Sequence, residues 1–294
     1  MMQFTAIDLS KLPAPNIIQP LNFDDVLAEN IALYKIEFPE WDATVESDPI
    51  MSALRVTAYK EIGLRGQIND GAKACMIAKA EKEDLDNLVA DFGLVRETIT
   101  PATDDTPAVM ESDDRLRKRR ILAPEGLTNA GSVGAYMYWA MNNNIIEDAL
   151  VETPVEGTVK ITLMAFGDSG AASPSNIAYM AGVLSVDLRR PLTDNLLLES
   201  VAVINYTITA ILRIYAGLDF AEIEAQALES LNAYIADMRK MGSDITLSGI
   251  NAALKVEGVE RVIISSPAVD IAISATQKAY CDPANINISS EVAV

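Results

Sequence analysis

The pattern of hydrophobic and polar residues is helical over the first third of the chain. A first helix is predicted to begin near Asn22, whose side chain can cap it, and to end before Pro39. A second helix is predicted to begin at 47–49, where Ser-Asp supplies a cap and proline occupies the first turn. Apolar residues then recur at helical spacing, and these are Leu54, Ala58, Ile62, Ile68, Ala72 and Met76. A short third helix over 84–92 is closed by Gly93.

Two features of this region concern its surroundings. Gly63, Gly66 and Gly71 weaken the long helix but allow another helix to approach closely. Residues 1–21 contain a Leu-Pro-Ala-Pro stretch that favours extended structure, so they form either a loose tail or a strap laid on a neighbour. The apolar residues Ile17, Ile18 and Leu21 favour the strap.

A connector over 98–112, rich in threonine and interrupted by two prolines, marks the best domain boundary in the chain. A helix follows Ser112 and carries a dense group of charges: Asp113, Asp114, Arg115, Arg117, Lys118, Arg119 and Arg120. Another helix is expected over 133–141. Strands are expected over 145–153, 157–166 and 196–203, with a helix over 175–188 before the last of them.

The last third alternates between strand and helix patterns. Apolar residues occupy every second position from Tyr206 to Ile214, which is typical of a half-buried strand. An amphipathic helix over 220–238, a shorter helix over 247–254 and a strand over 259–265 follow. The inward face of the first helix is predicted to consist of Ile223, Ala227, Leu231 and Tyr234.

The tail after Pro267 is apolar and strand-like, and a strand needs an edge with which to pair. It therefore joins either its own sheet or that of a neighbouring copy.

These elements predict an α+β fold, with a helical N-terminal region followed by two small α+β domains. The predicted divisions are an extended arm at 1–21, a helical bundle region at 22–97, the connector at 98–112, a middle α+β domain at 113–200, and a C-terminal α+β domain at 201–294.

Composition removes several classes of function. The 294-residue chain contains no histidine, so a Ser–His–Asp triad and imidazole metal ligands are impossible. Cys75 and Cys281 are far apart and form no paired motif, which argues against a disulfide framework or a zinc site and fits synthesis in a reducing compartment. A net charge of −19 spread along the chain argues against direct nucleic-acid binding. No apolar run is long enough to predict membrane insertion.

The remaining candidate chemistry is weak. Asp113 and Asp114 could serve a carboxylate-dependent hydrolase, but a capped helix with a solvated or interface-facing basic side explains them better. The acidic residues at 84–91 lack the spacing of a calcium loop, and the Gly-Asp-Ser-Gly stretch at 167–170 is typical of a turn. Tyr136, with the aromatic residues near it, is typical of a core or an interface. We therefore predict no catalytic, cofactor or metal site.

Three stretches together resemble one protein family. The first combines Leu-Pro-Ala-Pro at 12–15 with Asn-Phe-Asp at 22–24 and the Asp-Leu-Asp-Asn-Leu element at 84–88. The second is Met-Glu-Ser-Asp-Asp-Arg-Leu-Arg at 110–117, followed by Gly-Ser-Val-Gly-Ala-Tyr at 131–136. The third runs from Arg-Pro-Leu-Thr-Asp at 190–194 through 257–267 to the tail at 277–281. In this order and spacing they resemble the baseplate J-like family of contractile-tailed temperate phages and phage-tail-like particles, over nearly the whole chain.

The resemblance implies a structural role and a set of partners. In this family, paired copies join a partner wedge protein, protein I, through a helical bundle, and C-terminal domains of neighbouring wedges close a sixfold ring. A sheath-initiator protein, protein W, lies nearby. The resemblance implies a place in the baseplate of a virion or tail-like particle, after assembly in the bacterial cytoplasm, with no cofactor. A non-ring adaptor for tail fibres stays open as an alternative, beside the hydrolase.

The expected interface residues follow from these roles. Leu54, Ile62 and Ile68 are predicted to contact other chains in the bundle, and Val259 and Ile271 to contribute to the ring. Tyr136 is a further interface candidate. As the family's ring contacts suggest, deletion of 268–294 is expected to leave wedges that form but rings that do not close. Arg117 and Arg120 are expected to face an acidic neighbour or the acidic body of the same chain, and reversing their charge is expected to leave the monomer folded.

Overall fold

The computed structural model describes residues 12–13, 17–42, 47–128, 131–186, 189–191 and 193–292. These residues divide into two compact units. A helical unit comprises the described residues up to Arg96 together with Ser112–Ile121, and an α+β unit comprises Glu97–Glu111 and the described residues from Leu122 onward. The predicted α+β class, with a helical N-terminal region followed by domains, is confirmed.

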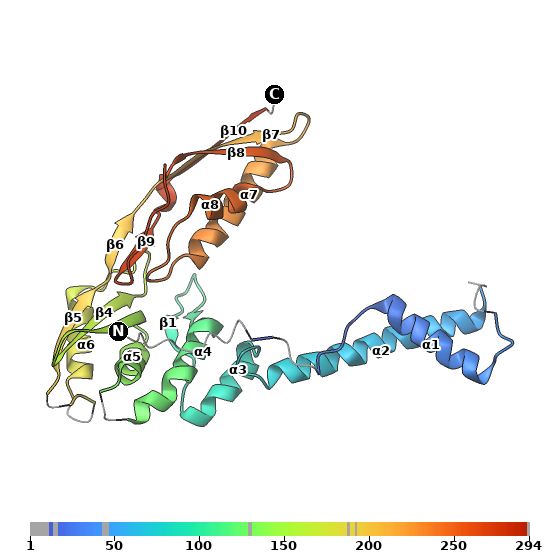
Figure 1. Ribbon diagram of the computed structural model, residues 1–294, viewed down its shortest axis with the longest axis horizontal. Helices are drawn as coiled ribbons and strands as arrows, with labels where there is room; N and C mark the ends of the chain where they lie inside the picture. The colour runs from blue at the N-terminus through green and yellow to red at the C-terminus, as the bar shows by residue number, and fades with distance from the viewer. Residues whose placement is uncertain are drawn as a thin grey trace. The chain divides into compact units, whose positions relative to one another are not determined.

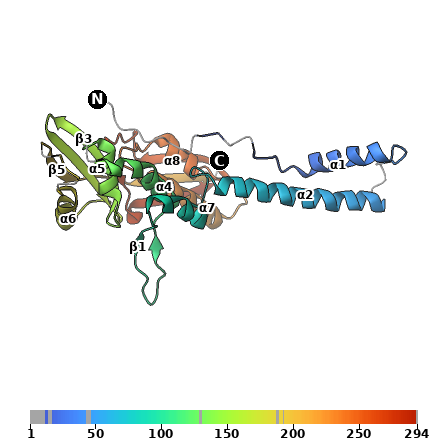
Figure 2. The same ribbon diagram turned by 90° about the horizontal axis from the view of Figure 1, so that it is seen from below.

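The helical unit contains two long helices that lie side by side in both views (Figures 1 and 2). Its elements are α1 (Phe23–Glu37), α2 (Pro49–Ala74), α3 (Lys82–Val89), a 3₁₀ turn (Ala90–Phe92) and α4 (Asp113–Leu122). The predicted caps are confirmed, because Asn22 accepts a hydrogen bond from the Asp24 N–H and Asp48 accepts one from the Ile50 N–H. Gly93 ends the third helical segment with a φ of 68°, which favours glycine.

The described end of the N-terminal arm is fastened to α2 of its own chain. The Gln19 N–H donates to the Asn69 amide oxygen at 2.9 Å, and the Asn69 NH₂ donates to the Gln19 carbonyl at 2.8 Å. Asn69 is 4% exposed, so this pair satisfies an otherwise costly buried amide. The strap predicted for this segment therefore lies on its own helix at Gln19, rather than on a neighbour; the rest of 1–16, except Leu12 and Pro13, lies outside the described residues.

Helix α4 differs from the predicted domain division. The sequence assigns it to a middle domain that begins at residue 113, whereas the structure groups Ser112–Ile121 with the helical unit. The reason is that its arginines bind groups that precede the connector, including the carbonyls of Ile77 and Ala80. The other predicted boundaries stay predictions.

The middle part of the α+β unit is a three-stranded sheet covered by helices. Strands β3 and β4 pair antiparallel, and β5 joins β4 in parallel after the crossover helix α6. Its core contains Tyr136, Met141, Ile161, Leu163 and Met180. The elements are a 3₁₀ turn (Ala123–Leu127), α5 (Val133–Met141), β3 (Ile146–Val155), β4 (Thr158–Ala165), α6 (Pro174–Leu184) and β5 (Asn195–Ser200).

The C-terminal part has a core of its own. Its main sheet has the order β10-β7-β8, and a second two-stranded sheet pairs β6 with β9. Alternate residues of β7 from Ile208 to Ile214 are buried, as predicted, and the helix residues Ile223, Ala227 and Leu231 pack in the same core. The elements are β6 (Ala202–Asn205), β7 (Ile208–Ile214), α7 (Phe220–Asp237), α8 (Leu247–Leu254), β8 (Val259–Ser266), β9 (Gln277–Tyr280), a 3₁₀ turn (Pro283–Asn285) and β10 (Ile286–Val292). Figure 1 shows α7 and α8 along the sheet.

Three details differ from the sequence-based expectations. The strand expected over 196–203 ends at Ser200, because the Val201 N–H donates to Leu163 while the next N–H donates to Thr276, so the chain changes sheets there. The connector contributes a small hairpin, β1 (Thr98–Thr100) and β2 (Val109–Met110), visible in Figure 2. The helix expected over 175–188 ends at Leu184, and its last expected residue lies outside the described residues.

The C-terminal tail pairs with strands of its own domain. Residues of β9 pair in parallel with β6, and residues of β10 pair in parallel with β7. The tail was expected to join either its own sheet or that of a neighbouring copy, and the structure shows it in the sheets of its own domain. Deletion of 268–294 would remove two strands of the fold, so it cannot isolate a ring contact as first expected.

The buried face of α7 gives a direct test of this packing. Leu231 is fully buried in the C-terminal core, whereas Leu228 on the same helix is 41% exposed. Replacing Leu231 by alanine should lower the free energy of unfolding by about 3 kcal/mol, because it removes apolar contacts and leaves a cavity. The same change at Leu228 should cost less than about 1 kcal/mol. Urea denaturation of both variants measures the difference, and equal losses would contradict the assigned face.

Candidate interaction surfaces

The α1–α2 hairpin exposes much of its apolar surface. Among the described residues, α1 buries Val26 and α2 buries Met51, Ala58 and Asn69. Large apolar residues of the two helices that are each at least 50% exposed are together called here the hairpin face. On α2 they lie around much of the helix, because Tyr59 and Ile68 point to opposite sides. They are Leu33, Ile36, Val56, Tyr59, Leu64 and Ile68. Clusters of exposed apolar side chains of this kind mark sites of protein association.

The glycines of α2 lie in open space. Val56, Tyr59 and Gly63 are spaced i, i+3 and i+7, which places them on one side of the helix. A Cβ added at Gly63, Gly66 or Gly71 would meet no atom of the described residues within 4 Å. The helix they were predicted to approach is therefore not α1, and these positions leave room for another surface.

Polar contacts position the two helices against each other. The Arg65 guanidinium bridges Glu29 on α1 at 2.9 Å and Glu61 on its own helix at 2.6 Å. Phe23 and Tyr59 pack with ring centroids 4.5 Å apart. These contacts fix the hairpin, and they cover only part of the Tyr59 ring, which stays 66% exposed.

The predicted bundle residues share one broad side of α2 but differ in exposure. Leu54 and Ile62 are half-buried and share the side of Ala58, while Ile68 is 50% exposed. The residues that the sequence did not single out, Val56 and Tyr59, are more exposed than Leu54 and Ile62. The role of all five in binding another chain stays a prediction.

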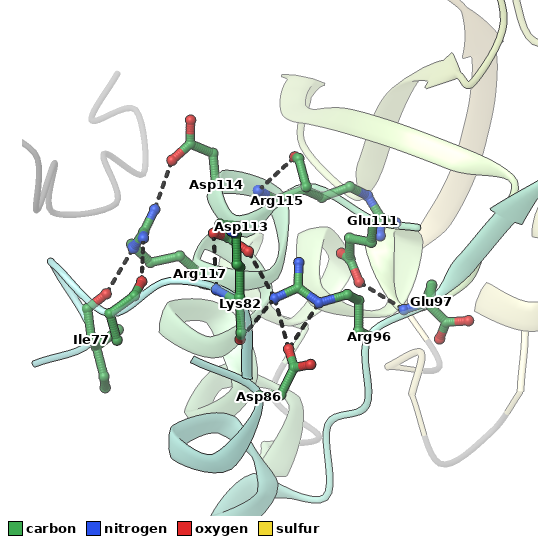
Figure 3. A network of polar contacts seen from close by, with 12 residues as sticks. Ile77, Lys82, Asp86, Arg96, Glu97, Glu111, Asp113, Asp114, Arg115 and Arg117 are labelled. Atoms are coloured by element: carbon green, nitrogen blue, oxygen red, sulfur yellow. Dashed lines mark hydrogen bonds and ion pairs between the residues drawn. The ribbon is translucent and has the colours of Figure 1, made fainter. Parts of the chain in front are cut away.

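A second cluster of contacts holds α4 against the segment between α2 and α3 (Figure 3). The Arg117 guanidinium donates to the Ile77 carbonyl at 2.7 Å, to the Ala80 carbonyl at 2.9 Å and to Asp114 at 2.6 Å. Its side chain is 15% exposed. Because Ile77 and Ala80 follow the end of α2, Arg117 fixes the path of the chain between the long helix and α3.

Arg96 and Asp113 form the other half of this cluster. The Arg96 guanidinium lies 2.7 Å from both Asp86 and Asp113, and the Lys82 N–H donates to the Asp113 carboxylate at 3.1 Å. Burial alone would raise the pKa of the Asp113 carboxyl, but the Lys82 N–H and the Arg96 guanidinium outweigh it and hold that pKa below its usual value. Burial opposes the charge of Arg96, yet its two carboxylate partners raise its pKa.

Arg120 completes the interior of the helical unit. It pairs with Asp91 at 3.1 Å, and its guanidinium lies 3.7 Å from the centre of the Phe92 ring. Arg117 and Arg120 thus face the acidic body of their own chain, which is one of the two expected arrangements. The expectation that charge reversal leaves the monomer folded is wrong on this geometry, because both guanidinium groups join separate segments.

The same cluster bears on the hydrolase alternative. A carboxylic acid that donates a proton needs a raised pKa, whereas that of Asp113 is lowered. Asp114 is 96% exposed at its side chain and pairs with Arg117. The geometry therefore supports a structural role for the pair.

Comparison with known proteins covers most of the chain. Residues 46–103 match the baseplate J-like N-terminal domain, residues 128–200 match the central domain, and residues 206–287 match the C-terminal domain. The chain is 40% identical over 287 residues to baseplate protein J of Escherichia phage P2, covering 94% of this chain and 95% of that protein. The chain belongs to the baseplate J-like family.

The family's three domains correspond to different parts of the structure. The N-terminal match includes α2 and α3, the central match runs from the end of the 3₁₀ turn to β5, and the C-terminal match spans β7 to the start of β10. Helix α4 lies between the first two matches. The arginine cluster of this J-like protein therefore depends on a helix outside the matched segments.

Two predicted interface residues lie inside the protein. Tyr136 is 1% exposed, and its hydroxyl donates to Asp194 at 2.8 Å. Val259 is 3% exposed in the C-terminal core. Neither can contact another chain in this conformation, because each is covered by its own domain. Ile271 is half-buried and forms a β-bridge with Ile245, so its outer surface stays a candidate contact of this J-like protein.

No further chemistry emerges from the described residues. Within them, no group of three or more Cys, Asp or Glu side chains is placed to hold a metal ion. Over the same ranges, no helix combines the length and apolarity needed to cross a membrane.

Sequence reasoning missed Asn69 and Arg96. Asn69 is a buried polar residue within the apolar stripe of α2, which is the signal that could have marked it as a fastening point. Arg96 follows the helix-ending Gly93 in a segment without periodicity, so no local pattern indicates its two carboxylate partners.

The role of Arg117 can be tested by its removal. Replacing Arg117 by methionine should lower the free energy of unfolding of the helical unit by about 2 kcal/mol, because two carbonyls lose a charged donor. The matched control is Lys73→Met on α2, whose ion pair with Asp70 is exposed. That change should cost less than about 0.5 kcal/mol. Chemical denaturation followed by circular dichroism measures both free energies of unfolding. Equal losses in the two variants would contradict the role of Arg117 in fixing the chain between α2 and α3.

The lowered pKa of Asp113 predicts an acid dependence. A carboxyl group with a lower pKa in the folded protein contributes stability above its unfolded value of 3.8, and that contribution is lost as the pH falls through the folded value. The Asp113→Asn variant should be less stable than the wild type at neutral pH and should lose less stability on acidification. Thermal melts from pH 7 to pH 2 measure this, and parallel curves would contradict the ion pair with Arg96.

Proposed function

We propose that this protein is a structural component of the baseplate wedge of a contractile phage tail or tail-like injection particle. Its membership of the baseplate J-like family supports a structural role in a baseplate. The single observation that carries the finer proposal is the hairpin face, which leaves long helices without a cover of their own.

The helical unit is the proposed site of wedge assembly. Two helices that expose apolar residues such as Val56, Tyr59 and Leu64 gain stability when a further helix covers those residues. The glycines of α2 leave space for such an approach. We propose that the occupants are a second copy of this chain and a partner wedge protein of the protein I type.

The C-terminal domain is the proposed site of contact between wedges. The order β10-β7-β8 leaves β8 and β10 at the edges of the sheet. Edge strands offer unpaired backbone groups to another chain, and Ile271 adds partly exposed apolar surface nearby in the same domain. Neighbouring copies that meet there would close a sixfold ring.

The remaining partners and the location belong to the same proposal. A sheath-initiator protein of the protein W type would lie against the assembled ring, in the baseplate of the virion or tail-like particle. Assembly would take place in the bacterial cytoplasm. The net charge of −19 supports protein partners rather than direct contact with nucleic acid.

Substitution on the hairpin face tests wedge assembly. The double variant Val56→Asp and Leu64→Glu places two charges at positions that are 55% and 60% exposed, so the isolated chain should keep its melting temperature. Its co-purification with the partner wedge protein should fall at least about tenfold, since a charge buried in an apolar interface is costly. The measurement is affinity capture from cells that produce both proteins.

A matched control uses an exposed valine of the C-terminal domain. Val269 is 71% exposed, and Val269→Asp should leave capture of the partner wedge protein unchanged. Full capture by the Val56/Leu64 variant would contradict assembly through the hairpin face. Equal loss in both variants would show that capture does not distinguish the two domains, which also contradicts the proposal.

A further inference from the structure

A polar joint connects the middle and C-terminal parts of the α+β unit. Their hydrophobic clusters consist of different residues, the first ending at Leu198 and the second beginning at Ile204. The chain passes between them at Val201, whose N–H donates to Leu163 on β4, while the N–H of Ala202 donates to Thr276 in the C-terminal part. Two separately packed cores with a short crossing between them are the structural requirements of a hinge.

Two cations of the C-terminal part hold a turn of the middle part. Arg239, which follows α7, donates to the carbonyl of Gly167 and lies 3.4 Å from the Glu147 carboxylate. Lys278 on β9 donates to the carbonyl of Asp168. Both cations line a cavity of about 270 Å³ together with Asp168, Tyr280 and Cys281.

The Lys278 amine is poorly satisfied. The residue is 1% exposed, yet among the described residues its amine makes one hydrogen bond, of 3.4 Å, although an ammonium has three N–H donors. The amine also lies over Gly170, where an added Cβ would come within 2.6 Å of it. A buried ammonium with a single long hydrogen bond is costly, because water would solvate it better.

We propose that Lys278 is a built-in weak point of this joint, so that the middle and C-terminal parts separate at Val201 while each core stays folded. Opening would release the amine to water and leave both hydrophobic clusters intact. Arg239 would contribute in the same direction, because it places a second positive charge near Lys278. The carboxylates of Glu147 and Asp168 oppose this effect and keep the closed form populated.

The electrostatics give the joint a pH dependence of definite sign. Burial and the nearby Arg239 lower the pKa of Lys278 from 10.5 to about 8, against the opposing effect of Glu147 and Asp168. The Lys278 amine therefore binds a proton more weakly in the closed joint than in the open joint, so protonation favours opening. Opening is most favourable below pH 8, and this advantage fades as the pH rises from about 8 toward 10.5.

Hydrogen exchange on the full-length chain tests the proposal. Peptides that cover 163–170 and 200–202 report on the joint, and a peptide that covers 208–214 reports on the C-terminal core. In Lys278→Met, which keeps a long apolar side chain without the charge, joint amides should exchange at least about tenfold more slowly than in the wild type at pH 7. Core amides should exchange at least as slowly as in the wild type.

Lys240→Met is the matched control, because Lys240 is 63% exposed at its side chain and pairs with Asp237. It should leave joint exchange unchanged. The wild type supplies a second measurement that needs no variant: joint exchange, corrected for the intrinsic chemical rate, should slow about tenfold between pH 7 and pH 9. If Lys278→Met fails to fold, this pH dependence of the wild type tests by itself whether the Lys278 amine controls opening.

Several outcomes would overturn the proposal. Equal or faster joint exchange in Lys278→Met would identify Lys278 as an ordinary stabilising contact. A wild-type joint whose corrected exchange does not change with pH would show that its amine does not control opening. Exchange of joint and core amides at one common rate would show that the two parts unfold together, without a hinge.

Discussion

A helix can bury its apolar residues only against another surface. Among the described residues, α1 and α2 bury few side chains beyond those at their contact with each other. Two neighbouring helices cover one stripe apiece, so most of the apolar residues on the α1–α2 hairpin stay in contact with water. The hairpin must therefore be held in place by contacts other than a core. Asn69 fastens the N-terminal arm, Arg65 bridges the two helices, and Arg117 fixes the chain that leaves α2. The availability of the hairpin face to partners depends on this polar framework.

Three arginines of the helical unit are directed inward, which changes the charge that a partner meets. Side-chain exposure is 12% for Arg96 and 15% for Arg117 and Arg120, whereas the partner carboxylates Asp91 and Asp114 are 57% and 96% exposed. The surface of this unit is therefore more acidic than its composition suggests. Free copies repel one another at this surface, and a partner that covers it has to supply positive charge or displace solvent from apolar residues.

Local structure could be predicted from the sequence, and long-range pairing could not. Asn22 and Asp48 cap helices because each cap depends on residues within one turn, and β7 has a two-residue period that marks its buried face. By contrast, the carbonyls bound by Arg117 lie 37 and 40 residues away, and Asn69 binds a residue 50 positions away. The cap at Ser112 identified α4 as a helix but could not show on which unit it packs. The sequence likewise could not show that Tyr136 and Val259 are covered by their own domains.

The position of β10 has a consequence for synthesis of the chain. This strand pairs in parallel with β7, so that Ile286 lies opposite Ile208, and the sheet needs residues from the very end of the described chain. During translation the helical hairpin and the middle part emerge first. The edge of β7 that pairs with β10 stays unpaired until β10 has been synthesised. A chain that stops early keeps that edge exposed and lacks a finished C-terminal domain. The C-terminal sheet is therefore complete only after Val292 has left the ribosome, and a contact that depends on this sheet can form only from that point.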